Sequence, residues 1–253
     1  MSEKGNQAVK TVSFMMLITL FGKILGMVRE QLLAANYGTD MQAAAFLLAS
    51  RIPRTFFDVI FASAISASFI PVFVEYLQKK GRQEAFSLAN RFITMISTVT
   101  LLMMLLGMAF AKPLTLLIAP GYDVETVTLC VGLLRMLFPT MLFTAVAFSF
   151  VGILQSLEEF NVPAALSVVS NGVLILYYIF FNEKFGILGL TAAFLIGWAM
   201  QAVIQIPSLW KKGYHYHPDF HFKDEGLRKI GKLMLPVMVS TWIQPINFMV
   251  NTR

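Results

Sequence analysis

The residues that could do chemistry in this sequence are ionisable side chains inside long apolar segments. A charge at the bilayer centre costs about 2.5 to 3.5 kcal/mol on insertion scales, so such residues are rare unless they face a wet cavity or a partner. A basic residue, Arg135, lies in the fourth apolar segment. The first two segments hold the other ionisable residues, which are Lys23, Arg29, Glu30, Arg51, Arg54 and Asp58.

The spacing of these residues groups them on helix faces. Lys23 and Glu30 are seven apart and share a face, as do residues 51 and 54, which are three apart. Asp58 follows Arg54 by four positions, so the two can pair. Glu30 and Asp58 are therefore the expected charge partners, and four bases face two acids.

A surplus of positive charge at low dielectric needs an anion. Arginine suits bidentate phosphate contact, so the pattern favours a cavity for a phosphate or diphosphate head group, held by Lys23, Arg29, Arg51 and Arg54. Two simpler interpretations remain. Arg29 could extend to the membrane interface, and Arg54 could simply be neutralised by Asp58.

Glycine and proline supply points where these segments can bend or approach closely. Gly22 and Gly26 flank Lys23, and Pro53 lies between the two arginines of the second segment. Broken helices are common where transporters bind substrate. Ordinary packing is the alternative, because both residues are frequent in transmembrane helices.

Other polar residues predict no catalytic or metal centre. Asn171 and Gln205 are best interpreted as helix–helix hydrogen-bonding groups. His215, His217 and His221 have metal-like spacing but no cluster of thiols or carboxylates to complete a site. We find no catalytic triad and no nucleotide loop, so we expect no enzyme, no ATP-driven pumping by this chain alone and no cofactor beyond a coupling ion.

The composition places these residues in a membrane. Of 253 residues 57% are hydrophobic and 13% are charged, whereas soluble domains have about 25% charged residues. The net charge of +6 does not indicate nucleic-acid binding, because the bases lie in loops between apolar segments or within them. The single cysteine excludes an internal disulfide.

Seven segments are long enough to cross a bilayer, which takes about 20 apolar residues. We therefore predict an all-α, polytopic transmembrane bundle with spans at about 9–36, 41–77, 86–111, 124–154, 162–181, 188–210 and 227–250.

Loop charge predicts the orientation, because cytoplasmic loops are enriched in Lys and Arg. The N-terminus, the loop between the second and third spans and the loop between the sixth and seventh spans lie on one side and hold most of the bases: Lys4, Lys10, Lys79, Lys80, Arg82, Lys211, Lys212, Lys223, Arg228, Lys229 and Lys232. The loops on the other side hold little beyond Lys112 and Lys184. We therefore expect the N-terminus in the cytoplasm.

Several motifs resemble one family over essentially the whole chain. The run from Gly22 to Glu30 (GKILGMVRE) resembles the first-span signature S-R-x-L-G-x-x-R-[DE] of the MurJ/MviN family. Ser66 to Pro71 (SASFIP), Ala119 to Gly121 (APG), Arg135 to Pro139 (RMLFP) and Phe160 to Ala164 (FNVPA) also fit. These proteins are lipid II flippases of peptidoglycan synthesis, in the multidrug/oligosaccharidyl-lipid/polysaccharide exporter (MOP) superfamily.

The resemblance implies cavity bases at Lys23, Arg29 and Arg51. Lys23 keeps the charge of the family arginine but loses its planar fork. Arg54 is one turn before the position of the family's main second-span arginine and could compensate for it. Three positions lack the charge of the family pattern: Phe57, Ala62 and Ala44.

The resemblance also implies organisation and function. The family has about fourteen spans, so we expect an N-lobe of six helices at 1–211, a cytoplasmic linker at 212–226 and a seventh helix at 227–253. This favours a fragment of a longer protein. The implied activity is flipping of polyprenyl-diphosphate-linked saccharide, most simply lipid II, across the bacterial cytoplasmic membrane by alternating access. Expected partners are that lipid, membrane lipids and cell-wall synthesis proteins; another polyprenyl-linked glycan or a non-transporting scaffold role is the alternative.

Overall fold

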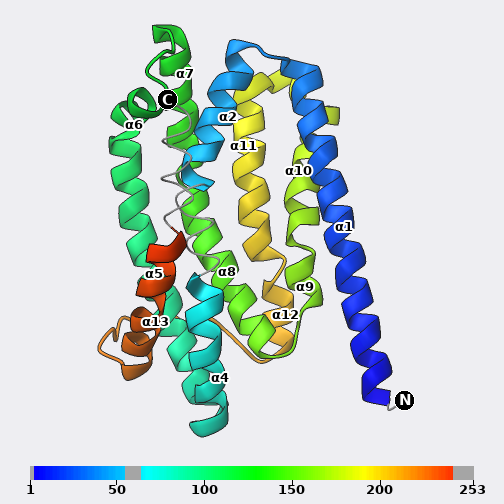
Figure 1. The fold of residues 1–253 in the computed structure, drawn as a ribbon, viewed down its shortest axis with the longest axis vertical. Coiled ribbons are helices and arrows are strands. Elements are labelled where there is room, and N and C mark those ends of the chain that lie inside the picture. The colour runs from blue at the N-terminus through cyan, green and yellow to red at the C-terminus, as the bar shows by residue number, and fades with distance from the viewer. Residues whose placement is uncertain (1–2, 55–63, 242–253) are drawn as a thin grey trace.

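The computed structural model describes residues 3–54 and 64–241, and every element within these ranges is helical. Figure 1 shows a bundle of long helices that run up and down, joined by short turns. The elements are α1 (Glu3–Tyr37), α2 (Met41–Pro53), the π-helix η2 (Ile65–Phe69), α4 (Ile70–Lys79), α5 (Arg82–Ala109), α6 (Ala111–Ile118), α7 (Val124–Leu137), α8 (Thr140–Ser156), α9 (Asn161–Ala164), α10 (Leu166–Phe180), α11 (Asn182–Val203), α12 (Ile206–Lys211) and α13 (Glu225–Thr241).

Helix α1 stands at the edge of the bundle (Figure 1). It has 35 residues, so it is about 52 Å long at 1.5 Å per residue. Most of its large apolar side chains are exposed, as expected of a helix that faces lipid. Its main neighbour is α10. The two helices meet where Gly22 is buried against Ser167, near the start of α10.

Two apolar cores hold the other helices together. One is formed chiefly by η2, α4, α5, α8 and α13, around stacked rings such as Phe69 and Phe92, whose centroids lie 4.7 Å apart. The other is formed by α2, α7, α10 and α11, where Phe46 meets Phe194 edge to face.

Prolines and a glycine explain the breaks in the long helices. Pro113 has no N–H to donate to the carbonyl of Ala109, and the chain bends between α5 and α6 at Phe110. Pro139 separates α7 from α8 in the same way. Gly186, with φ +54°, interrupts α11 after its first turn.

Five of the seven predicted spans are confirmed as apolar helices of membrane-spanning length: Val9–Tyr37, Arg82–Ala109, Val124–Ser156, Asn161–Phe180 and Asn182–Lys211. The predicted second span at 41–77 contains α2, η2 and α4, and residues 55–63 within it lie outside the described ranges. The stretch after 111, between the predicted third and fourth spans, forms α6. The seventh span is described only as far as Thr241.

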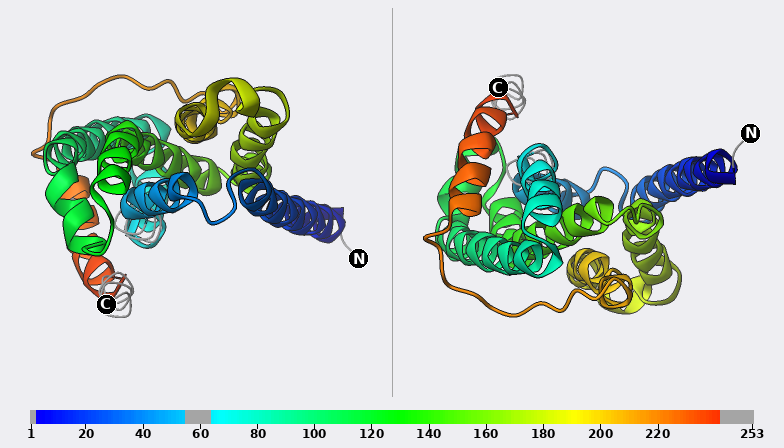
Figure 2. Two further views of the ribbon diagram at one scale, coloured as in Figure 1. Left: turned by 90° about the horizontal axis from the view of Figure 1, so that it is seen from above. Right: turned by 90° about the horizontal axis from the view of Figure 1, so that it is seen from below.

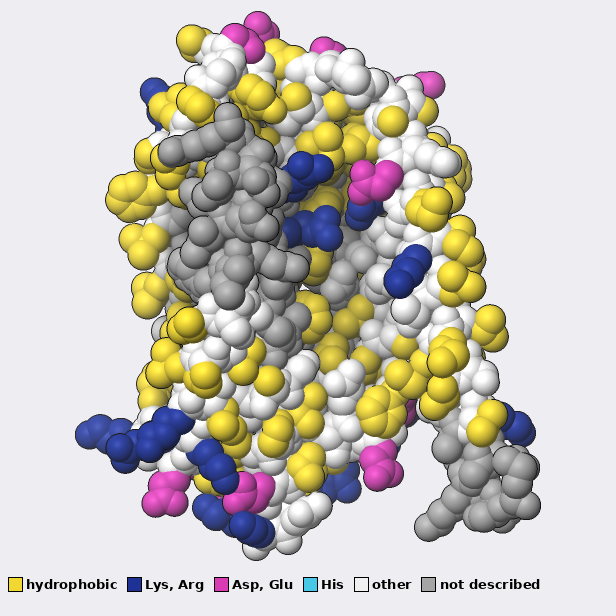
Figure 3. All heavy atoms as spheres, viewed as in Figure 1, with side chains coloured by type: hydrophobic (Ala, Val, Ile, Leu, Met, Phe, Trp, Pro, Cys, Tyr) yellow, Lys and Arg dark blue, Asp and Glu magenta, His cyan; other side chains and the backbone are white. Residues whose placement is uncertain are grey.

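Basic side chains gather at one end of the bundle (Figure 3). The N-terminus, the end of α4 and the start of α13 lie at the lower end in Figure 1, and Figure 3 shows Lys and Arg side chains gathered there. Residues 212–224, which we call the strap, join α12 to α13 without helical structure. Figure 2 shows the strap passing along the outer edge of the bundle, on the opposite side from α2.

Candidate functional site

A basic cavity opens between α1, α2, α10 and α11. Figure 3 shows Lys and Arg side chains with a carboxylate beside them in the hollow of this face. The cavity has a volume of about 80 Å³. Its walls combine three arginines and one glutamate with an apolar lining: Arg29, Glu30, Leu33, Phe46, Leu47, Ser50, Arg51, Arg54, Leu174, Tyr178, Leu190 and Phe194.

Two side-chain contacts hold Arg29 in place. Its side chain is 21% exposed and forms an ion pair with Glu30, whose side chain is 58% exposed. Its Nη1 atom donates to Oδ1 of Asn171 on α10, at 3.1 Å. These two contacts hold the guanidinium at the wall of the cavity.

Asn171 on α10 bonds both to Arg29 and to the carbonyl of Gly22 on α1. Its side-chain amide, 7% exposed, donates from Nδ2 to the carbonyl of Gly22 at 3.1 Å while its oxygen accepts from Arg29. The prediction that Asn171 joins two helices is confirmed. Its contact with Arg29 was missed, because the two residues are 142 positions apart and nothing in the sequence marks them as neighbours.

Helix α2 supplies Arg51 and Arg54. Asp40 begins the helix by accepting a hydrogen bond from the N–H of Met41 at 2.7 Å. The guanidinium of Arg54 lies 5.8 Å from the ring centroid of Trp198 on α11, within range of a cation–π contact. The predicted shared face of Arg51 and Arg54 is confirmed, since both line this cavity.

A second, wider cavity lies beside the first. Its volume is about 890 Å³, and it is formed by α2, α6 and the turn of residues 119–122. Arg51 lines both cavities, and the remaining lining is mostly apolar, including Leu47, Leu116 and Leu117. The basic cavity therefore borders apolar space, an arrangement that suits a ligand with a charged head and a hydrocarbon tail.

Other predicted residues lie elsewhere. Lys23 is exposed on α1 and does not line the basic cavity; six residues separate it from Arg29, about 9 Å along the helix. Asp58, the predicted partner of Arg54, is outside the described residues. Arg135 donates from Nε to the carbonyl of Met108 at 3.2 Å, beside the proline bend of α5. Pro53 is the last residue of α2.

Two of the predicted polar residues outside the cavity have contacts within the bundle or the strap. Gln205 donates from Nε2 to the carbonyl of Ala147 on α8 at 3.0 Å, which confirms its predicted helix–helix role. His221 contacts Asp219 at 2.7 Å. In the part of the chain that the structure describes, no three His, Cys, Asp or Glu side chains are placed to hold a metal ion.

The helical bundle has the fold of MOP superfamily transporters. A MOP superfamily transporter from Pyrococcus furiosus superposes with a TM-score of 0.74 at 16% identity, over 94% of this chain and 53% of that one. A solved structure of a MATE transporter has the same TM-score at 17% identity, over 94% of this chain and 54% of that one. At these identities the likeness concerns the fold.

Sequence comparison gives the family. The family described as lipid II flippase MurJ matches residues 33–253, and the chain belongs to this family. The probable lipid II flippase MurJ of Buchnera aphidicola (subspecies Acyrthosiphon pisum) is 31% identical over 240 residues, which is 93% of this chain and 47% of that protein. A structure of lipid II flippase MurJ in an inward closed conformation superposes with a TM-score of 0.78 at 26% identity, over 94% of this chain and 49% of that one.

Two facts follow from these comparisons. The chain spans about half the length of the curated relatives that it matches. Those relatives are named as flippases, so the family consists of transporters rather than enzymes, and the chain is a multi-spanning protein of a bacterial membrane. The resemblance predicted from the first-span motif is confirmed.

Proposed function

We propose that this chain is the lobe of a flippase that holds the diphosphate of a polyprenyl-linked saccharide, most simply lipid II, while it crosses the cytoplasmic membrane. The single observation that carries this proposal is the convergence of Arg29, Arg51 and Arg54 on one cavity inside a membrane bundle. Among the described residues, three arginines and the acid Glu30 line this cavity, and several bases together in surroundings of low dielectric favour an anion.

The chemistry of the ligand follows from the lining. Arginine forks donate paired hydrogen bonds to phosphate oxygens, and a diphosphate offers oxygens to more than one fork. The neighbouring apolar cavity beside Arg51 has room for the first isoprene units of the tail. Lys23, exposed on α1 outside the cavity, stays a predicted contributor to binding.

The transport cycle is proposed from the architecture. We expect alternating access between this lobe and a second one, driven by an ion gradient or the membrane potential. The N-terminus is expected in the cytoplasm, because the start of α1 lies at the same end of the bundle as the ends of α4 and α12, where Lys79, Lys211 and Lys212 occur (Figure 1). Contact with cell-wall synthesis proteins is a further expectation of this role.

The test is complementation in a bacterium whose own lipid II flippase can be depleted. A full-length gene that includes this lobe should restore growth, and the double change Arg51→Ala with Arg54→Ala should abolish it at equal membrane abundance. Lys184→Ala, which neutralises an exposed base in the first turn of α11 that does not line the cavity, is the matched control and should complement fully.

Two outcomes would overturn the proposal. Growth that persists in the double variant would favour a non-transporting scaffold role. Failure of the unaltered gene to support lipid II flipping, combined with translocation of another polyprenyl-linked glycan in vesicles, would move the substrate to that glycan.

A further inference from the structure

Charge along α5 locates one edge of the membrane. Between Arg91 and Lys112 the sequence has 20 residues without a charge, from Phe92 to Ala111. In a helix such a run spans about 30 Å, the thickness of the hydrocarbon core. Arg91 therefore lies at the boundary between hydrocarbon and head groups, at the end of the bundle where the strap passes.

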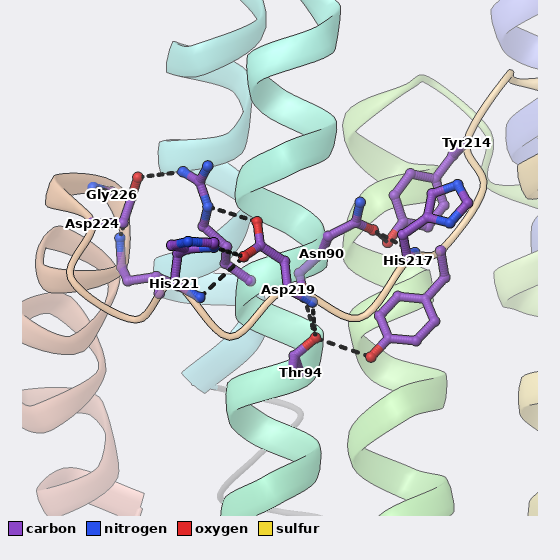
Figure 4. Close-up of polar contacts among 11 residues, drawn as sticks. Asn90, Thr94, Tyr214, His217, Asp219, His221, Asp224 and Gly226 are labelled. Atoms are coloured by element: carbon purple, nitrogen blue, oxygen red, sulfur yellow. Dashed lines mark hydrogen bonds and ion pairs between the residues drawn. The ribbon is translucent and has the colours of Figure 1, made fainter.

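The strap is bound to α5 at this boundary. Arg91 donates from Nε to Oδ2 of Asp219 at 2.9 Å and from Nη1 to Oδ2 of Asp224 at 2.6 Å, so one guanidinium holds two carboxylates of the strap (Figure 4). Asp224 in turn accepts the N–H of Gly226 at 2.7 Å and of Leu227 at 3.1 Å at the start of α13. The two acids are thus neutralised and the strap has a fixed place.

Backbone N–H groups of the strap donate hydrogen bonds to side chains of α5. The N–H of His217 donates to Oδ1 of Asn90 at 3.3 Å, and the N–H of Asp219 donates to Oγ1 of Thr94 at 3.1 Å. Asn90 and Thr94 are one helical turn apart and also accept the hydroxyls of Tyr214 and Tyr216 (Figure 4). Irregular backbone next to lipid is tolerated only where its polar groups are satisfied in this way.

The strap exposes aromatic side chains. Phe220 is 67% exposed and Phe222 is 41% exposed, and the two rings meet edge to face at 6.0 Å. Trp210, at the end of α12, is also exposed. Exposed bases flank these rings at Lys211 and Lys223. Aromatic rings beside bases are typical of the head-group layer, where the rings meet apolar chains and the bases meet anionic lipid.

We propose that the strap is a preformed lipid-contact surface, which α5 holds at the head-group boundary and whose rings at Phe220 and Phe222 lie in the leaflet. The partner is a phospholipid layer, because the surface is at the depth where α5 enters hydrocarbon. The inference does not depend on the transported substrate, and it predicts that the strap stays in lipid contact whatever the cavity binds.

The test uses an environment-sensitive fluorophore on the strap. Phe220→Cys, in a Cys130→Ala background, is labelled with nitrobenzoxadiazole and reconstituted into vesicles of phosphatidylethanolamine and phosphatidylglycerol. Gln83→Cys, exposed in the first turn of α5 before Arg91, is the matched control. Because Phe220 is exposed, its replacement removes no buried packing.

The expected result is blue-shifted emission at position 220 and several-fold stronger quenching by lipid with a nitroxide on its head group than at position 83. Equal quenching and water-like emission at both positions would overturn the proposal. Blue-shifted emission without quenching by the nitroxide lipid would also overturn it, because protein rather than lipid would then cover the strap.

Discussion

At the scale of single residues, the site depends on a side chain that carries no charge. Asn171 accepts from Arg29 and donates to the carbonyl of Gly22, so it orients the guanidinium relative to α1. A hydrogen bond to a charged group contributes about 1.5 to 3 kcal/mol, and removal of its partner leaves the arginine free to leave the cavity wall.

We therefore predict that Asn171→Ala weakens binding of undecaprenyl diphosphate about tenfold, since 1.4 kcal/mol corresponds to a factor of ten. Affinity is measured on the purified chain in detergent. Ser170→Ala is the control, because Ser170 bonds only to carbonyls of its own helix and should leave the affinity unchanged. Equal affinity of Asn171→Ala and the parent chain would show that the amide does not position Arg29.

At the scale of elements, α1 depends on its contact with α10. A Cβ atom at Gly22 would lie 2.1 Å from Oγ and 3.3 Å from Cβ of Ser167, so the two helices approach as closely as only glycine allows. Gly172 on α10 has nothing within 4 Å of a Cβ atom.

We predict that Gly22→Ala lowers the free energy of unfolding by about 1 kcal/mol through overpacking. Gly172→Ala should have no cost, or stabilise α10 slightly, because alanine is the better helix former. Thermal unfolding in detergent compares the two variants. An unchanged midpoint for Gly22→Ala would mean that α1 can shift freely on α10.

The strap should respond to acid. The backbone N–H and ring of His221, followed by Arg91, lower the pKa of Asp219 from 3.8 to about 2. A carboxylate whose pKa is lowered by folding stabilises the folded state above its ordinary pKa, and that contribution is lost as the pH falls toward the lowered value. The groups that face Asp219 are Arg91 and His221, with Asp224 on the same guanidinium.

We predict that a spin label at position 220 gains mobility as the pH falls from about 4 toward 2. In the Asp219→Asn variant the spin label should be mobile already at neutral pH, and its mobility should not change as the pH falls. A label that stays immobile through the acid range would mean that the ion pairs with Arg91 do not hold the strap.

Much of the fold could be predicted from the sequence, because a run of about 20 apolar residues can do little else than cross a bilayer. The breaks were harder. Pro113 accompanies the bend between α5 and α6. Because proline is also common in loops, its presence did not predict the short helix. Arg51 and Arg54 were found by their spacing on one helix. The partners Asn171 and Asp219 were not, because they meet their arginines across 142 and 128 positions.

At the scale of the whole molecule, the charge distribution predicts the orientation. Cysteine is placed at Lys184, on the upper side, or at Gln83, on the lower side, in the Cys130→Ala background. A membrane-impermeant maleimide should label position 184 in intact cells, and position 83 only after permeabilisation. The reverse pattern would place the N-terminus outside the cytoplasm and contradict the predicted orientation.

The central claim is that the arginine cavity recognises a diphosphate on a polyprenyl chain. The most direct measurement compares the affinity of the purified chain for undecaprenyl diphosphate with its affinity for undecaprenol, which has the same tail and no charge. We predict a preference for the diphosphate of at least about tenfold, lost in Arg51→Ala with Arg54→Ala and kept in Lys112→Ala, which alters a base outside the cavity. Equal affinity for both lipids, or a preference that survives in the double variant, would contradict it.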